Sequence, residues 1–62
     1  MTNLLIVSDS NELTFVKKQV VSKIEYYVYQ YSKSLTKLGE TLLLTKEQLD
    51  RMLSQNICKV LN

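Results

Sequence analysis

The sequence predicts a mainly α protein, a helical hairpin built from one long helix and one shorter antiparallel helix. The first observation behind this is a set of apolar residues that recur at helical spacing through the first half of the chain. The second is a helix-start signal in the second half. The third is length, because 62 residues allow one small domain. The predicted divisions are an arm or short β-strand over 1–9, a helix over 10–38, a leucine-rich corner over 39–44 and a helix over 45–61.

The long helix depends on eight apolar residues that lie three or four positions apart. At about 100° per residue, all eight fall on one side of a helix. Composition opposes this, because Val and Tyr favour strands and each costs a few tenths of a kcal/mol relative to Ala in a helix. We give the periodicity more weight, since packing supplies most of a helix's stability. The eight residues are Leu13, Val16, Val20, Ile24, Tyr27, Tyr31, Leu35 and Leu38.

Helix-end signals flank this segment. The apolar run over residues 4–7 fits a short strand or an extended arm, and its length does not decide between them. Asp9 and Glu12 have the spacing of a capping box and suit the positive end of a helix dipole. Gly39 follows the last apolar position, where a left-handed C-terminal cap would lie.

The second half begins with three consecutive leucines at residues 42–44, which a solvated loop would rarely contain. They predict either a short strand that pairs with residues 4–7 or a buried corner. Thr45 and Gln48 then form a capping box, and Glu47 with Arg51 adds a surface ion pair one helical turn apart. The helix that follows has one apolar face, made of Leu49, Met52, Leu53, Ile57, Val60 and Leu61.

Self-association is predicted because so short a chain buries only about 60% of its unfolded surface. Cys58 is the only cysteine and there is no histidine, so neither an intramolecular disulfide nor a zinc site is available. We expect Cys58 on the exposed side of the second helix, and Asn56 either fixing the register of a seam or bonding a nearby carbonyl. The second helix is too short to cover the start of the first. Either the arm over residues 4–7 or the same surface of a second chain could cover it, and we favour a homodimer. The predicted interface comprises Leu13, Val16, Val20, Val21 and Asn56.

Positive charge is concentrated in the predicted long helix. Residues 13–38 contain five lysines against Glu25, a net charge of +4, although the whole chain carries only +2. On the side away from the apolar stripe, lysines alternate with aromatic residues, which are enriched in protein interfaces. The same pattern would suit nucleic acid, through phosphate contacts and base stacking, or a solvated surface. The predicted partner-binding residues are Phe15, Lys18, Tyr26, Tyr29, Lys33 and Lys37.

The composition argues against catalysis. Without histidine, the usual general base and the Ser-His and Cys-His nucleophile pairs are missing, and Gly39 alone cannot form a phosphate-binding loop. Glu47 and Asp50 fit the acidic first turn of a helix better than a metal site. We therefore expect a non-enzymatic adaptor or inhibitor that binds a protein partner and uses no cofactor, metal or small-molecule substrate.

One segment resembles a known DNA-binding module. Leu38 and Gly39, followed by a Thr-capped helix over 45–53, resemble the turn and second helix of a helix-turn-helix. The segment departs from that module at Glu40, where an apolar residue is usual, and at residues 42–44, which lengthen the turn. The resemblance implies the alternative function, a small DNA- or RNA-binding regulator.

Compartment and source are inferred from composition. The longest apolar run is four residues, shorter than a membrane span or a signal-peptide core. Together with the single cysteine, this predicts a reducing, cytoplasmic setting. The absence of proline, the single glycine and the many Asn, Lys, Leu and Tyr residues are typical of an AT-rich genome and suggest a phage or mobile-element product.

Overall fold

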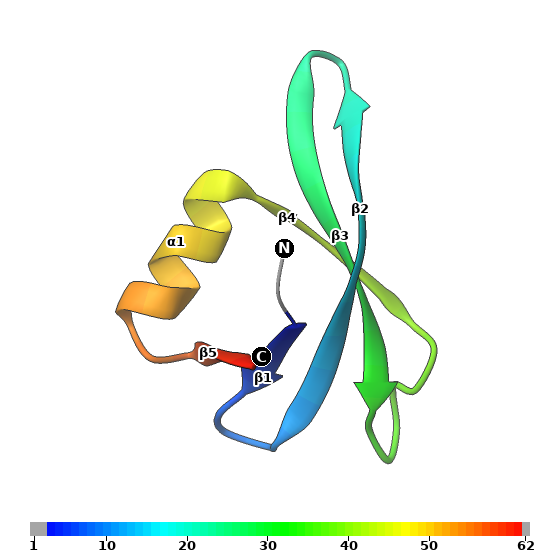
Figure 1. Ribbon diagram of the computed structural model, residues 1–62, viewed down its shortest axis with the longest axis vertical. Helices are drawn as coiled ribbons and strands as arrows, with labels where there is room; N and C mark the ends of the chain where they lie inside the picture. Colours follow the sequence, from blue (N-terminus) through cyan, green and yellow to red (C-terminus); the bar gives the residue numbers. More distant parts are fainter. Residues whose placement is uncertain (1–2, 62) are drawn as a thin grey trace.

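The protein is an antiparallel β-sheet of five strands with one short helix (Figure 1). This computed structural model describes residues 3–61. The order in the sheet is β4-β3-β2-β1-β5, so the first four strands form a meander and β5 returns to lie beside β1. The elements are β1 (Asn3–Ile6), β2 (Asn11–Val21), β3 (Ile24–Lys33), β4 (Thr41–Thr45), α1 (Lys46–Ser54) and β5 (Cys58–Leu61).

The predicted mainly α fold and helical hairpin are wrong, because the segment 10–38 contains the long strands β2 and β3 and no helix. Two irregularities produced the helical spacing. The chain reverses at Ser22 and Lys23, and a β-bulge between Phe15 and Lys17 shifts the alternation of β2. A bulge inserts one extra residue, so apolar positions on either side of it lie three apart instead of two.

β3 concealed its own alternation. Tyr27, Tyr29 and Tyr31 lie at every second position and contact the core, as a strand requires. Val28, on the opposite face, is also buried, at 6% exposure. Apolar residues on both faces make a strand appear as a continuous apolar run. The strand propensity of Val and Tyr was the correct signal.

The turn between β2 and β3 is a two-residue hairpin loop. Val21 pairs with Ile24, and between them Ser22 (φ 52°) and Lys23 (φ 67°) both adopt left-handed backbone conformations. This is the type I′ geometry whose twist matches that of the flanking strands. It is usually built from Asn-Gly, and a Cβ in this region costs roughly 1 kcal/mol or more. Because neither residue is Asn or Gly, the turn had no sequence signature.

The second half was predicted in part. Residues 41–45 form a strand, but β4 pairs with β3 and not with residues 4–7. The helix is confirmed over Lys46–Ser54 with Thr45 as its N-cap, but its predicted end at residue 61 is wrong. Asn56 adopts a left-handed conformation (φ 59°) after the helix, and the chain then enters β5. The strand over residues 3–6 is one of the two structures expected there.

The predicted capping box is confirmed. The Gln48 backbone N–H donates to Thr45 Oγ1 (3.2 Å), and the Thr45 N–H donates to Gln48 Oε1 (3.0 Å). Arg51 and Glu47 form the predicted ion pair at 3.3 Å. These contacts are local, which explains why the sequence alone predicted them. No helix in the described part of the chain is long and apolar enough to cross a membrane.

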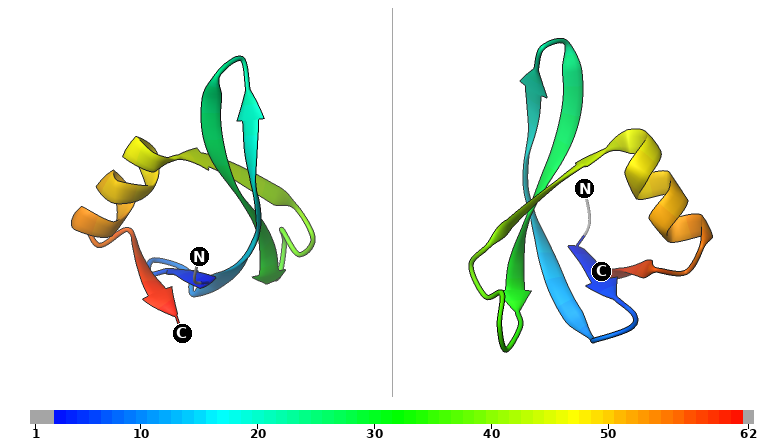
Figure 2. Two further views of the ribbon diagram at one scale, coloured as in Figure 1. Left: turned by 45° about the horizontal axis from the view of Figure 1, so that its top comes forward. Right: turned by 180° about the vertical axis from the view of Figure 1, so that it is seen from behind.

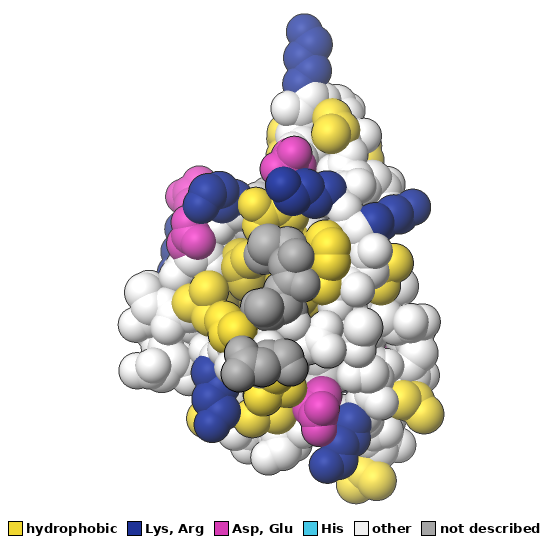
Figure 3. All heavy atoms as spheres, in the orientation of Figure 1, with side chains coloured by type: hydrophobic (Ala, Val, Ile, Leu, Met, Phe, Trp, Pro, Cys, Tyr) yellow, Lys and Arg dark blue, Asp and Glu magenta, His cyan; other side chains and the backbone are white. Residues whose placement is uncertain are grey.

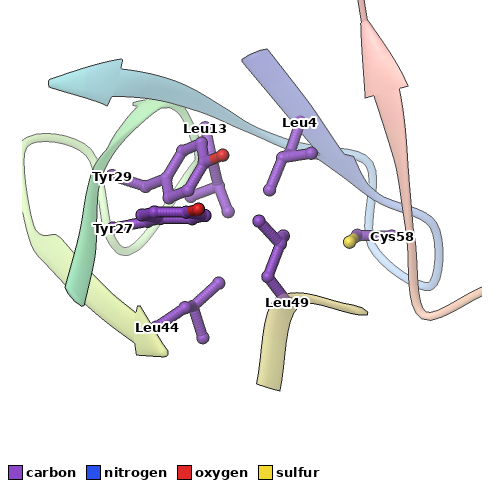
Figure 4. Packing of buried hydrophobic residues seen from close by; sticks show 7 residues of the cluster. All are labelled: Leu4, Leu13, Tyr27, Tyr29, Leu44, Leu49 and Cys58. Atoms are coloured by element: carbon purple, nitrogen blue, oxygen red, sulfur yellow. The ribbon is translucent and has the colours of Figure 1, made fainter. Parts of the chain in front are cut away.

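The core lies between the sheet and α1 (Figure 4). The sheet curls, and α1 connects its two edge strands, β4 and β5 (Figure 2). Cys58 is only 1% exposed, so its predicted exposure is wrong: it lies in β5 opposite Ile6, with its side chain in the core. The core residues are Leu4, Leu13, Tyr27, Tyr29, Leu44, Leu49 and Cys58.

Leu49 attaches α1 to the sheet and should be essential for stability. It is 3% exposed, and we expect Leu49→Ala to lower the free energy of unfolding by about 2–5 kcal/mol through lost burial and the cavity left behind. Leu35, which is fully exposed, supplies the matched control, Leu35→Ala. Urea denaturation followed by circular dichroism measures both. Equal stability of the two variants would contradict this packing.

The strained turn offers a gain in stability. Replacing Ser22 and Lys23 by Asn and Gly should raise the unfolding free energy by roughly 1 kcal/mol, because the new residues tolerate positive φ. In a domain of this size that corresponds to about 4–8 °C in Tm. The control pair Ser22→Ala with Lys23→Ala keeps both Cβ atoms and should show no increase. A similar Tm for both pairs would argue against the turn geometry.

Candidate interaction surface

β2 and β3 extend beyond the strands beside them. β1 pairs with β2 only over Asn11–Leu13, and β4 pairs with β3 only over Tyr26–Gln30. Within this sheet, residues 16–25 therefore pair only across β2 and β3, with no third strand beside them, and they project from the body as a two-stranded ribbon, at the top of Figure 1. We call residues 16–25 the ribbon.

The end of the ribbon carries three exposed apolar side chains. Val20 is 66% exposed, Val21 44% and Ile24 47%. Val21 and Ile24 are cross-strand partners, while the neighbouring Val20 pairs with Glu25 and points to the opposite face. Apolar surface therefore lies on both faces of the ribbon. Single exposed apolar residues are common on protein surfaces, whereas three close together at a projecting end make a candidate contact surface. We call Val20, Val21 and Ile24 the apolar tip.

Lysines surround the apolar tip. Lys17, Lys18 and Lys23 are exposed, with Glu25 as the one acidic residue of the ribbon. Figure 3 shows basic side-chain atoms at the very top of the molecule, where the ribbon ends, hydrophobic atoms directly below them and further basic side chains lower down. Lys18 Nζ lies 5.6 Å from the centre of the Tyr27 ring, an exposed cation–π contact of about 0.5–1 kcal/mol.

Aromatic packing joins the base of the ribbon to the core. The Phe15 ring lies edge-to-face with Tyr29 (5.5 Å, 71°) and Tyr27 (6.5 Å, 84°). Edge-to-face pairs contribute about 0.5–1.5 kcal/mol each beyond the area they bury. The ribbon is therefore held at its base by fixed rings and at its end by a two-residue turn. Such a projection would lose little conformational entropy on binding.

Tyr29 and Cys58 carry the perturbed ionisable groups of the core. Burial, and then the neighbouring Cys58 and Tyr27, raise the pKa of the Tyr29 hydroxyl, and burial raises the pKa of the Cys58 thiol. The Tyr29 hydroxyl is buried without a hydrogen-bond partner among the described residues. A thiol with a raised pKa is a weak nucleophile. These two groups thus favour a structural role for this core.

The predicted partner-binding residues do not share one face. Phe15, Lys18 and Tyr29 lie on the core side of the sheet, where Tyr29 has no exposed surface, and the half-buried Tyr26 lies on the opposite side. At the other end of the molecule, Lys33 pairs with Glu12 at 3.7 Å and Lys37 Nζ lies 5.4 Å from the Tyr31 ring centre. The helix that was to unite these residues does not exist, and their binding roles stay predictions.

The predicted dimer interface is also divided. Leu13 lies in the core at 0% exposure, whereas Val16, Val20 and Val21 are exposed along β2. Asn56 is exposed in the turn after α1, where its left-handed conformation accounts for an Asn. Val20 and Val21 therefore belong to the apolar tip and not to a helical seam.

Lys17, Lys23 and Ile24 also lie on this surface, although the sequence did not predict them to share one. Lys17 and Lys23 were counted only as charge, and Ile24 was assigned to the apolar side of the predicted long helix. A hairpin reading would have found them, because the strand-favouring segments before and after Ser22 converge on this turn. The missing Asn-Gly signature removed the local evidence for that reading.

The described residues also form one open hollow of about 240 Å³ at the opposite end of the molecule. The Asp9 carboxylate there accepts hydrogen bonds from the Asn11 backbone N–H (3.2 Å) and from Asn11 Nδ2 (3.0 Å). These two bonds, one to each carboxylate oxygen, fix the orientation of the Asp9 side chain. Its lining residues are Asp9, Ser10, Asn11, Lys33, Ser34 and Leu35.

Comparison with known proteins leaves the geometry as the guide to function. No protein-family model, curated protein or solved structure matches the chain. The helix-turn-helix resemblance does not survive, since a strand and not a helix precedes Leu38 and Gly39. Within residues 3–61, no three acidic or cysteine side chains gather into a metal-ligand cluster. The ribbon with its apolar tip is the most distinctive surface.

Removing the unpartnered hydroxyl should stabilise the protein. We expect Tyr29→Phe to raise the unfolding free energy by up to about 1–3 kcal/mol, the cost of burying an unsatisfied polar group. Tyr26→Phe, whose side chain is half-buried, is the control and should have little effect. Urea denaturation measures the unfolding free energy of both variants. A loss of stability in Tyr29→Phe would mean that the hydroxyl has a bonding partner.

The raised pKa values predict alkaline destabilisation. For a group whose pKa is higher in the folded state, stability is complete below the unfolded pKa and falls as pH rises through the folded pKa. The decline should begin near pH 8.5, about the ordinary pKa of cysteine, and steepen above about pH 10 as tyrosine ionises. Cys58→Ala should flatten the first part of this decline in thermal unfolding measured against pH. An unchanged pH profile in that variant would contradict the assignment.

Proposed function

We propose that the protein is a non-enzymatic binding protein that inserts the apolar tip of its ribbon into a pocket of an acidic protein partner. The supporting observation is the clustering of Val20, Val21 and Ile24, each 44–66% exposed, at the end of a projecting ribbon. Apolar centres that become fully desolvated supply most of the binding energy in protein interfaces. A pocket that covers all three side chains gains roughly 25 cal/mol for each Å² of apolar surface removed from water.

The lysines define the chemistry of the partner. Lys17, Lys18 and Lys23 lie around the apolar tip, while Glu25 is the one opposing charge of the ribbon. Charged rims accelerate association with surfaces of opposite charge and exclude partners of like charge. A partner with an apolar pocket and an acidic rim fits both parts of the ribbon. Of the six partner-binding residues predicted from the sequence, Lys18 belongs to this surface.

A binding protein of this kind acts by occupying its partner's pocket, as an inhibitor, or by bringing the partner to another molecule, as an adaptor. The absence of histidine from the sequence supports a role without acid–base catalysis. We place it in a reducing cytoplasm, a setting that fits the single, unpaired Cys58. A phage or mobile-element source fits the composition and remains part of the proposal.

Polar substitution of the apolar tip tests the proposal. Val20→Thr, Val21→Thr and Ile24→Thr together remove apolar surface but keep the β-branched shape that strands favour, so the fold should persist. Val60→Thr, equally exposed at 49% on β5, is the matched control. Wild type and Val60→Thr should capture the same partner from the native host, and the triple variant should lose it. Circular dichroism and thermal unfolding establish that all three proteins are folded.

The competing nucleic-acid function gives a different result. Phosphate contacts would make binding fall steeply with salt, with a log–log slope near −0.9 per contact on duplex DNA. Capture from nuclease-treated lysate, followed by a salt titration, therefore separates the two classes. A partner that the triple variant retains, or that disappears with nuclease, would contradict binding through the apolar tip.

A further inference from the structure

The two edges of the sheet differ in how they are protected. β4 and β5 are the outer strands, and each is hydrogen-bonded as a strand on one side only. Within residues 3–61, the elements that contact β4 are β3 and α1. Natural edge strands commonly carry lysine or proline, which discourages pairing with another chain. β5 has Lys59 within its four residues, but β4 (Thr41–Thr45) contains no charged residue and no proline.

The outward backbone groups of β4 can be assigned from the hydrogen bonds beside it. The Tyr31 N–H donates to the Glu40 carbonyl (2.9 Å), so position 40 faces β3. Because backbone direction alternates along a strand, the N–H and C=O groups of Leu42 and Leu44 point toward β3, and those of Leu43 point away from it. The capping bond agrees, because the N–H of Thr45, two residues beyond Leu43, is available to Gln48 Oε1. Within residues 3–61, the Leu43 N–H and C=O thus face the free edge without a strand partner.

The sequence around Leu43 is complementary to itself in the antiparallel direction. A second copy rotated about Leu43 sets Leu43 opposite Leu43, Leu42 opposite Leu44 and Thr41 opposite Thr45. Beyond the ends of the paired strands, Glu40, which precedes β4, lies near Lys46, the first residue of α1, of the second copy, and this contact occurs twice by symmetry. Opposite charges facing one another across strands are stabilising. The charges at the two ends therefore select this register and this orientation.

Exposure agrees with such a contact. Leu43 is 44% exposed on the outer face of the sheet, beside the buried Val28 with which it pairs. Antiparallel pairing of two β4 strands brings the two Leu43 side chains side by side, continuing the apolar strip that begins at Val28. Lys46 is also exposed, and its Nζ lies 3.3 Å from the Asp50 carboxylate in a solvent-exposed pair, which it would exchange for Glu40 of the second copy.

We propose that two copies of this chain associate through their β4 edges into a continuous ten-stranded sheet. The Leu43 N–H donates to the Leu43 carbonyl of the second copy and the reverse, and the Glu40–Lys46 pairs flank this centre. The contact is small beside the roughly 1,200–2,000 Å² of stable interfaces, so the dimer exchanges with monomer. It does not involve the apolar tip and is independent of the proposed function.

Charge reversal tests the pairing. Sedimentation equilibrium at low salt should show a concentration-dependent dimer for the wild type. Glu40→Lys and Lys46→Glu each place like charges opposite one another twice, and each should weaken the dimer roughly tenfold. The double variant restores opposite charges and should recover the affinity of the wild type. Lys59→Glu, on the other edge, is the control and should leave the dimer unchanged.

A backbone variant tests the same contact separately. Leu43→Pro removes an N–H that faces away from β3, a position where an edge strand tolerates proline, and it should abolish the dimer while circular dichroism shows the fold retained. The triple threonine variant of the apolar tip should dimerise as the wild type does. The proposal is overturned by a wild type that is monomeric at every attainable concentration, by a double variant as weak as the single ones, or by a dimer that persists in folded Leu43→Pro.

Discussion

Burial of the β3 tyrosines between the sheet and α1 is the contact on which the remaining structure depends. Tyr27 and Tyr29 extend from the middle of β3 toward Leu4 and Leu49, which come from the two ends of the chain (Figure 4). A chain of 62 residues can cover only a small core, and two aromatic rings fill much of it. The curl of the sheet and the position of α1 follow from enclosing these rings.

The limited size of this core determines what stays outside it. β1 and β4 are four and five residues long, whereas β2 and β3 have eleven and ten. The long strands therefore leave the body as a ribbon, and Val20, Val21 and Ile24 have no core to enter. Burial on folding accounts for Leu4 and Leu13 but gives no reason for apolar residues at the tip. Burial against a partner gives one.

The small size of the sheet also leaves β4 at an edge. A five-stranded curled sheet ends in two strands, and α1 joins them without pairing with either backbone. One edge carries Lys59, while the other carries three leucines between two threonines. The apolar tip and the β4 edge are separate surfaces, so association of two copies would present two ribbons. Two linked binding elements can raise the apparent affinity for a partner that offers two sites.

Sequence alone determined the features that involve neighbouring residues. The Thr45–Gln48 capping box, the Glu47–Arg51 pair and the start of α1 depend on contacts within one helical turn, and all were predicted. The strands and the ribbon were decided by tertiary structure. Residues 13–38 have helical periodicity and strand propensity together, and the choice between them depends on pairing β2 with β3 across a turn that has no local signature. Cross-strand hydrogen bonds and the enclosure of Tyr27 and Tyr29 by distant segments favour strands over a helix here. These contacts join residues far apart in the sequence, so no short stretch of it reveals them.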